Sequence, residues 1–124
     1  MTMLYDVDIT DLYWDCAEYA LRRTGSLLTL DTLLYSEGNK LRSWGELQVG
    51  DILCWFVPEV AHYQLPLQIK DRTLIAPSIS VERHFGVYEG DCYVSDLTFV
   101  KDCPILRMRE FSSLHLPNRY FRSE

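Results

Sequence analysis

A cysteine at the start of a predicted helix is the residue of this sequence best placed to do chemistry. Cys16 follows Asp15 in the stretch YWDCAEYALRRTG, and small or apolar residues recur at helical spacing over residues 15–24 before Gly25 ends the pattern. The free N–H groups and the dipole of a helix N-terminus lower the pKa of a thiol from its usual value of ~8.5. We therefore predict that Cys16 is a nucleophile; the alternative is a small buried residue of the helix.

A histidine in a later strand can act as the base that such a nucleophile needs. His84 opens the stretch HFGVYEGDCYVSDLTFV, in which the pattern predicts a β-hairpin with its bend at residues 89–91. An imidazole paired with Cys16 can take the thiol proton and return it to a leaving amine. The other two histidines, His62 and His115, have no motif around them.

A third group should orient the imidazole, and the hairpin register offers two candidates. A three-residue loop places His84 opposite Asp96 on one face of the sheet. A two-residue loop instead places Ser95 on the face of the histidine. We favour Asp96 and keep Ser95 as the alternative.

The remaining patterns position this site in an α+β domain that spans residues 1–124. Asp31 is expected to cap a short helix through residue 35, and the tail from residue 112 is expected to be irregular. The segment 58–83 contains three prolines and is predicted to be a flap or an insertion. Strands are predicted after a turn at residues 50–51, in a small hairpin at 67–76 around residues 70–72, in the hairpin at 83–100, and at 104–111.

Composition excludes several classes of function. Twelve basic residues against eighteen acidic ones give a net charge of −6, which argues against nucleic acid as a partner. The nearest basic patch, formed by Arg107, Arg109, Arg119 and Arg122, is interpreted as a solvated strand face and tail. No membrane span, zinc-site spacing or cofactor motif is present in the sequence, so we expect no metal, no cofactor and free thiols. Cys54, which lies inside an apolar strand, is predicted to be a core residue, as are Cys92 and Cys103. Without a signal peptide, synthesis in the cytoplasm is expected.

The order of these elements resembles the NlpC-like and CHAP-like cell-wall hydrolases of the papain-like superfamily. In that pattern an aspartate or glutamine precedes the nucleophilic cysteine, a Gly-Asp pair opens a strand, and a later strand begins with histidine and ends in Tyr-x-Gly. Three features differ: Ala17-Glu18 replaces the common Ser-Gly, the glycines upstream of the cysteine are missing, and residues 58–83 form a longer excursion than usual. The matching stretches are Asp15-Cys16, residues 49–51 and residues 84–90.

The resemblance implies a papain-like fold in which the helix with Cys16 packs on an antiparallel sheet that carries His84. It implies a thiol peptidase or amidase that cleaves peptidoglycan peptides, with Asp96 at the usual spacing after the histidine. Tyr5, eleven residues before Cys16, would assist the oxyanion, and Asp15 would lie beside the substrate. A phage or secretion-system enzyme, delivered to the periplasm or wall by a virion or another partner, is expected.

Two other functions fit the same residues. A Cys-His-acid site also serves an acyltransferase or deamidase that acts on a protein or lipid. A non-catalytic virion module that keeps the scaffold is the third possibility. The oligomeric state is left open by the sequence.

Overall fold

The computed structural model describes residues 4–12, 15–59, 64–69, 72–77 and 80–123, and in these residues the protein is α+β. Two α-helices precede most of the strands: α1 (Cys16–Thr24) and α2 (Leu30–Tyr35). Three short 3-10 helices lie at Ile9–Asp11, Trp44–Glu46 and Phe111–Ser113. The strands are β1 (Asn39–Lys40), β2 (Ile52–Glu59), β3 (Gln64–Ile69), β4 (Arg72–Pro77), β5 (Ser80–Gly90), β6 (Tyr93–Val100), β7 (Cys103–Glu110) and β8 (Arg119–Phe121).

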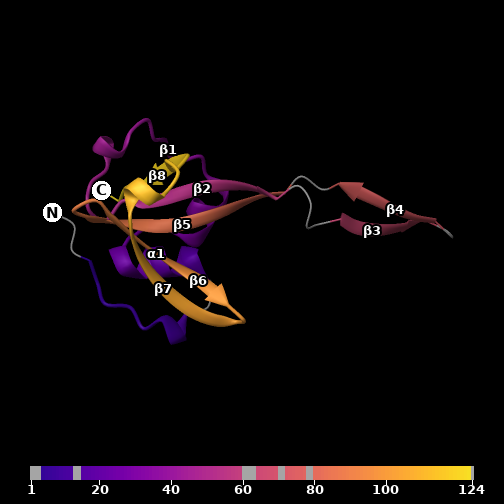
Figure 1. The fold of residues 1–124 in the computed structure, drawn as a ribbon, viewed down its shortest axis with the longest axis horizontal. Helices are drawn as coiled ribbons and strands as arrows, with labels where there is room; N and C mark the ends of the chain where they lie inside the picture. Colours follow the sequence, from indigo (N-terminus) through magenta and orange to yellow (C-terminus); the bar gives the residue numbers. More distant parts are fainter. Residues whose placement is uncertain (1–3, 13–14, 60–63, 70–71, 78–79, 124) are drawn as a thin grey trace.

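Six of these strands form one antiparallel sheet in the order β1-β8-β2-β5-β6-β7. β5 lies at its centre and pairs with β2 from Val87 to Ser80. Its pairing with β6 is much shorter and ends at Val87–Ser95. Beyond that point β6 and β7 curve away from β5 (Figure 1). The sheet therefore opens between β5 and β6.

The segment predicted to cover the site forms a hairpin that projects from the sheet instead. β3 and β4 pair only with each other, and the hairpin lies beyond the far ends of β2 and β5 (Figure 1). The hairpin predicted at 67–76 is thus confirmed, and the turn residues Lys70 and Asp71 lie outside the described residues. The flap has narrower bounds than expected, because residues 58–59 and 80–83 extend β2 and β5.

The predicted first helix is confirmed at both ends. Asp15 is the N-cap of α1, and Gly25 ends the helix in the left-handed conformation with a φ of 59°. A side chain there would also collide with the Tyr5 ring, since a Cβ would lie 2.4 Å from Cε2. The second helix begins differently from the prediction: Thr29, not Asp31, accepts the capping bond from the N–H of Thr32.

The C-terminal tail is not irregular, which corrects the prediction from the sequence. β8 pairs with β2 on one side and with β1 on the other. Both added strands are only two or three residues long, too short for a period of alternating hydrophobicity to reveal them. The tail thereby completes the sheet next to β2.

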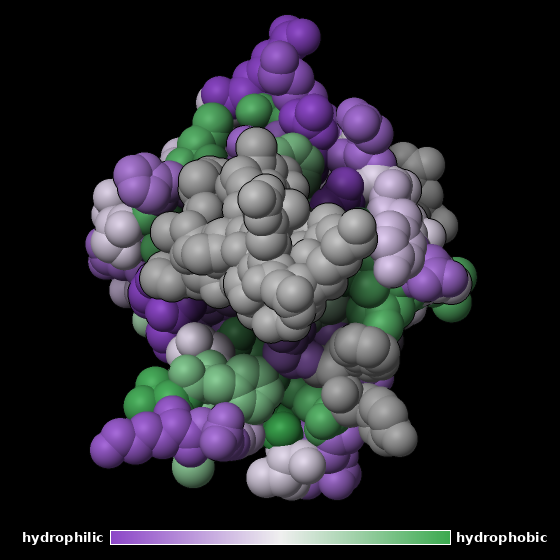
Figure 2. Space-filling model, turned by 90° about the vertical axis from the view of Figure 1, so that its right-hand side faces the viewer, coloured by the Kyte–Doolittle hydropathy of each residue, from purple (hydrophilic) through white to green (hydrophobic). Residues whose placement is uncertain are grey.

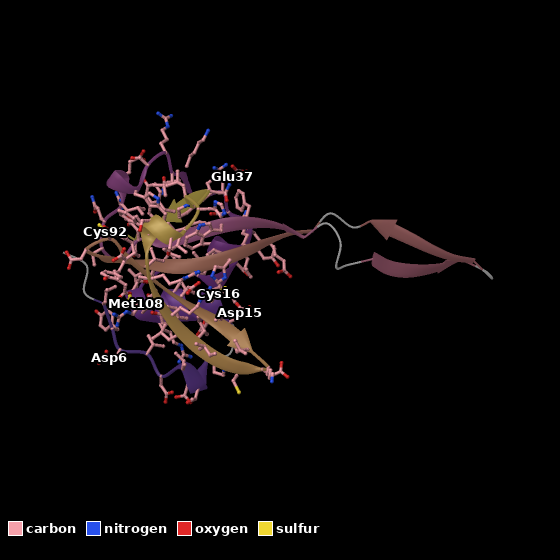
Figure 3. The ribbon with its side chains drawn as sticks, in the orientation of Figure 1. Asp6, Asp15, Cys16, Glu37, Cys92 and Met108 are labelled. Carbon is pink, nitrogen blue, oxygen red and sulfur yellow. The ribbon has the colours of Figure 1, made fainter. Side chains whose placement is uncertain are left out.

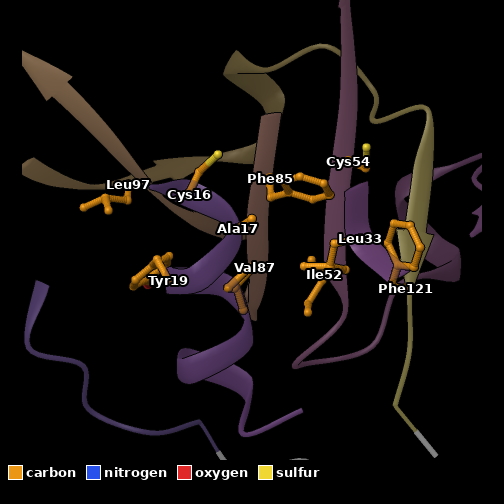
Figure 4. Close-up of a cluster of buried hydrophobic side chains, with 11 residues drawn as sticks. Cys16, Ala17, Tyr19, Leu33, Ile52, Cys54, Phe85, Val87, Leu97 and Phe121 are labelled. Carbon is orange, nitrogen blue, oxygen red and sulfur yellow. The ribbon is translucent and has the colours of Figure 1, made fainter. Parts of the chain in front are cut away.

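Apolar residues pack on both faces of the sheet. On the face covered by α1 and α2, Ala17, Tyr19 and Leu33 contact strand residues such as Ile52 and Phe85 (Figure 4). Cys16 lies at the edge of this cluster (Figure 4). On the other face the cluster contains Leu41, Leu47, Leu53 and Val94, with Trp44, Trp55, Tyr88 and Leu114 packed against it.

The surface around the base of the projecting hairpin has a mixed character. Hydrophilic and hydrophobic residues alternate there, without one continuous apolar face (Figure 2). Among the described residues, no helix has the length and apolar character that a membrane crossing requires.

Candidate active site

The Cys16 thiol is buried at the N-terminus of α1, with only 6% of the residue exposed. Asp15, the residue before it, makes no capping bond with its side chain. Its carboxylate instead accepts the S–H of Cys16 at 3.4 Å, and the two residues lie side by side (Figure 3). The aspartate therefore holds a protonated thiol.

The electrostatics of Cys16 differ from the prediction. Burial, followed by the charge and hydrogen bond of Asp15, raises the pKa of the Cys16 thiol to about 12. The backbone N–H groups of Phe85 and of Cys16 itself favour the thiolate but do not outweigh burial. The sequence predicted a lowered pKa from the helix terminus alone, and it did not reveal that the terminus is covered. The resting thiol is thus neutral.

The influence of the Phe85 backbone on the thiol shows on which side of β5 the sulfur lies. Tyr88 exchanges both backbone bonds with the β2 side, through Gly50 and Asp51 at 2.9 Å each. Because backbone groups alternate in direction along a strand, the N–H of Phe85 points toward β6. The β5–β6 ladder has already ended there. The N–H of Phe85 thus faces the opening of the sheet, near the thiol whose pKa it lowers.

His84 and Asp96 meet across the same opening. His84 Nε2 lies 2.6 Å from Asp96 Oδ2, and Asp96 is only 1% exposed at its side chain. The His84 ring also lies against Trp55 on the neighbouring strand, with 5.8 Å between the ring centroids. The imidazole is therefore held on two sides. No hydrogen bond joins it to the Cys16 thiol in the described part of the chain.

The register that brings these two residues together is not the one expected. The loop contains two residues, Asp91 and Cys92, both with positive φ, and not three. A β-bulge at Glu89 adds one residue to β5, so that Tyr88 pairs with Val94. This extra residue compensates for the shorter loop and keeps residues 84 and 96 on the same face of the sheet. Asp96 therefore shares the face of His84 as predicted, but it lies diagonally across from the histidine, not directly opposite.

Two arginines from β7 surround Asp96. Arg107 binds both carboxylate oxygens, with Nε at 2.9 Å from Oδ1, and Arg109 Nη2 lies 2.9 Å from Oδ2. Burial alone would raise the pKa of Asp96, but bonds from His84 and Arg107 and the nearby charges lower it to about 2. Together these groups carry two arginine charges and one carboxylate charge.

These contacts correct the interpretation of the C-terminal arginines as a solvated patch. Arg107 and Arg109 bind Asp96, and Arg122 binds the buried carboxylate of Asp51 at 2.7 Å. Arg119 lies 3.7 Å from Glu37. The spacing of two between Arg107 and Arg109, in a strand that follows Asp96 by a short turn, indicates a shared face, although the prediction of a solvated patch did not use it.

Ser95 and Tyr5 lie elsewhere. Ser95 faces α1, where it accepts from Tyr19 Oη at 2.7 Å and donates to Glu89 at 2.7 Å. Tyr5 packs at the other end of α1, where its N–H bonds to the carbonyl of Arg23. Neither residue is brought to the Cys16 thiol.

Two of the cavities in the described part of the chain are lined by residues of this site or their neighbours. One, of about 280 Å³, is lined by Trp55, His84, Arg109, Ser113, Leu114 and His115. The other, of about 340 Å³, lies on the α2 side and is lined by residues that include Asp15, Phe85, Glu82 and Arg83. The sequence pointed to neither cavity, because Trp55, Arg109 and His115 come from three separate segments. Of the two histidines without a motif, His115 lines the first cavity, and His62 lies outside the described residues.

The other three cysteines form no part of this arrangement. Cys54 is fully buried in the core as predicted, whereas Cys92 and Cys103 are exposed at turns, contrary to the expectation that they are core residues. All four thiols are free. No group of three or more His, Cys, Asp or Glu side chains suited to a metal ion occurs among the described residues.

Comparisons with known proteins found no matching family model, no similar curated protein and no similar solved structure. The resemblance to NlpC-like and CHAP-like hydrolases thus stays a prediction from the sequence motifs. The geometry and chemistry of the site are therefore the basis on which we infer a function.

Proposed function

We propose that this protein is a cysteine hydrolase of papain-like type that cleaves an amide bond through Cys16, His84 and Asp96. Peptidoglycan peptides are the substrate that the sequence resemblance favours. The observation that carries the proposal is the junction at the end of the β5–β6 ladder. There the backbone N–H of Phe85, the residue after His84, lies near enough to the thiol to lower its pKa, while His84 bonds to Asp96.

The two side chains start on different faces of the sheet, because Phe85 packs with Cys16 on the α1 face, whereas His84, its neighbour in β5, lies against Trp55 on the other face. The peptide nitrogen of Phe85 is attached to the carbonyl carbon of His84, only two bonds from its Cα. The proposed reaction requires the Cys16 side chain to rotate away from Asp15, through the opening beside Phe85, to the ring. Because Nε2 bonds to Asp96, Nδ1 is the nitrogen that accepts the thiol proton. We expect this rotation when substrate displaces water from the opening.

The reaction then proceeds in two steps, acylation of Cys16 and hydrolysis of the resulting thioester. His84 takes the thiol proton, Cys16 Sγ bonds to the substrate carbonyl carbon, and the C–N bond breaks as His84 protonates the leaving amine. Water then attacks the thioester while His84 takes one of its protons. The C–S bond breaks, the acid product leaves, and the proton returns to sulfur. The N–H of Cys16 is placed to stabilise the oxyanion in both steps.

Hydrolysis of purified peptidoglycan, followed as newly released amino groups, tests the proposal. The wild-type protein is expected to release them, and a thioester adduct on the Cys16 peptide should be trapped by rapid acidification. Cys16→Ala and His84→Ala should lose both signals, whereas the exposed-cysteine control Cys92→Ser should keep them. Full activity in Cys16→Ala would overturn the proposal.

One observation favours a second candidate, a non-catalytic interaction module. The resting thiol is buried and donates its proton to Asp15, as a structural cysteine would. Under this alternative no acyl adduct forms with peptidoglycan or with a general thioester-forming probe such as a p-nitrophenyl ester. An adduct with the ester but not with peptidoglycan would instead favour the acyltransferase or deamidase.

A further inference from the structure

The cavity of about 280 Å³ beside His84 has the composition of a binding site for an acidic group. Trp55 and Leu114 supply apolar surface, and Arg109 supplies a cation whose side chain is 35% exposed. Pockets that recognise small ligands combine apolar walls with a few polar groups that fix orientation. The cavity adjoins the imidazole, which is the base of the proposed reaction.

Arg109 has donors that the protein does not use. Its Nη2 binds Asp96, but its Nε is buried and has no hydrogen-bond partner among the described residues. Because Nε is closed to solvent, an occupant of the cavity would reach Arg109 through its Nη atoms. A carboxylate is the acceptor that a guanidinium binds best, because two parallel bonds fit its planar fork.

The charges around the cavity favour the same occupant. Among the described residues, Asp96 is the only carboxylate in contact with Arg107 and Arg109, so one positive charge remains uncompensated there. The second cavity has the opposite character. Asp15 and Glu82 line it, and its arginine, Arg83, donates to the carbonyl oxygens of Leu33 and Ser36. An acidic group is therefore directed to the His84 side.

We propose that the cavity beside His84 binds a free carboxylate of the substrate on Arg109, which makes the protein selective for acidic peptides. This inference rests on the proposed hydrolase function for its role in catalysis, but the binding itself does not depend on turnover. The carboxylate would belong to the residue next to the scissile bond, because the cavity and the imidazole share the His84 side chain.

Binding is tested first, in the Cys16→Ala variant of the full chain. N-acetylalanine and its neutral amide are titrated while NMR follows the Trp55 indole and the His84 and His115 rings. The carboxylate is expected to bind about 10- to 100-fold more tightly, the ratio for a charge-assisted pair. Equal affinity of the two probes in this protein, which needs no change at Arg109, would overturn the proposal.

Variants locate the preference at one arginine. Arg109→Gln should make the two probes equal, and Arg109→Lys should keep only part of the preference because lysine lacks the fork. Arg119→Gln removes the same charge from β8, outside the cavity, and should leave the preference unchanged. Loss of the preference in Arg119→Gln as well as in Arg109→Gln would overturn the assignment to Arg109.

Turnover separates this inference from the proposed function. Peptidoglycan is compared before and after its carboxylates are converted to amides with carbodiimide and ammonia. The wild-type protein should hydrolyse the amidated material about 10- to 100-fold more slowly. Equal Cys16-dependent rates would overturn the carboxylate site and leave the hydrolase standing. Selective carboxylate binding without any Cys16-dependent turnover would overturn the hydrolase and leave the carboxylate site standing.

Discussion

The Cys16 thiol keeps its proton at neutral pH, since burial raises its pKa to about 12. The thiolate, not the thiol, reacts with alkylating agents. We therefore expect iodoacetamide at pH 7.5 to label the exposed Cys92 and Cys103 well before Cys16 and the buried Cys54. Peptide mass spectrometry over a time course measures the four rates separately.

Unfolding the protein in urea is the matching control, because all four thiols should then react at similar rates. Faster labelling of Cys16 than of Cys92 in the native protein would mean that a populated conformer already places the thiol against His84. The sequence predicted that faster reaction, since a helix N-terminus can be read from residue types. The Phe85 strand that covers the sulfur comes from a segment almost seventy residues away, which residue types near Cys16 do not reveal.

Asp96 makes stability depend on pH in the acid range. Its folded-state pKa of about 2 lies below the ordinary value of 3.8, despite burial, because of His84 and the two arginines. A group with a lowered pKa stabilises the fold above its ordinary pKa and loses this effect as the pH falls through the folded value. We expect a loss of about 2 kcal/mol in unfolding free energy between about pH 4 and pH 2.

Urea unfolding of wild type and Asp96→Asn isolates this effect from that of other carboxylates. The variant should be less stable at pH 6, because the asparagine leaves Arg107 and Arg109 without a counter-charge. The gap between the two proteins should narrow as the pH falls toward 2. A gap that is constant with pH would show that the Asp96 charge does not stabilise the fold.

At the scale of elements, a buried polar chain fixes α1 to the sheet. Tyr19 Oη donates to Ser95 Oγ, Ser95 donates to Glu89, and Glu89 pairs with Arg23 near the end of the helix at 2.6 Å. Ser95 is fully buried, so its removal leaves the Tyr19 and Glu89 groups short of a partner. The helix that carries Cys16 is thereby held in one position over β5 and β6.

Ser95→Ala should lower the free energy of unfolding by about 1–3 kcal/mol, the cost of unsatisfied buried polar groups. The exposed Ser112→Ala should change it by less than about 0.5 kcal/mol. Under the proposed mechanism kcat on peptidoglycan should fall little in the folded fraction of Ser95→Ala. A large loss of kcat with unchanged stability would instead make Ser95 part of the active site.

The β5–β6 hairpin shows how far sequence reasoning reaches at this scale. Its two strands, its bend and the shared face of His84 and Asp96 were predictable from alternation. The β-bulge at Glu89 was not, because the sequence Glu-Gly-Asp fits either a three-residue loop or a bulge followed by a two-residue turn. For the same reason the sequence did not predict that the β5–β6 pairing ends at Val87. That end depends on the curvature of β6 and β7, not on local residue types.

At the scale of the whole molecule, the α+β class and the order of helix, strand and hairpins were predictable from the period of the apolar residues and from the turn residues between them. The six-stranded order was not, since β8 enters the sheet between β1 and β2 from the chain terminus. Such non-local pairing has no signature in a strand of three residues. The contacts of Arg107 and Arg109 with Asp96 likewise depend on strand pairing, because β7 must fold back beside β6.

The projecting hairpin β3–β4 is the part of the molecule that the rest of the fold is expected not to need. In the described part of the chain its two strands pair with each other and with no strand of the six-stranded sheet. β2 and β5 remain paired out to Glu59 and Ser80, the point from which the hairpin departs. Replacing residues 60–79 with Asn-Gly would join these two ends by a two-residue turn of the kind that favours antiparallel strands.

We expect the shortened protein to unfold in one cooperative transition in urea, with an unfolding free energy within about 1 kcal/mol of the wild-type value. The rate at which Cys16 forms an acyl adduct with a small p-nitrophenyl ester should not change, because the opening between β5 and β6 is intact. A rise in KM on peptidoglycan alone would assign substrate capture to the hairpin. Loss of cooperative unfolding would contradict the prediction, since it would mean that the hairpin holds the far ends of β2 and β5 together and that the body cannot form without it.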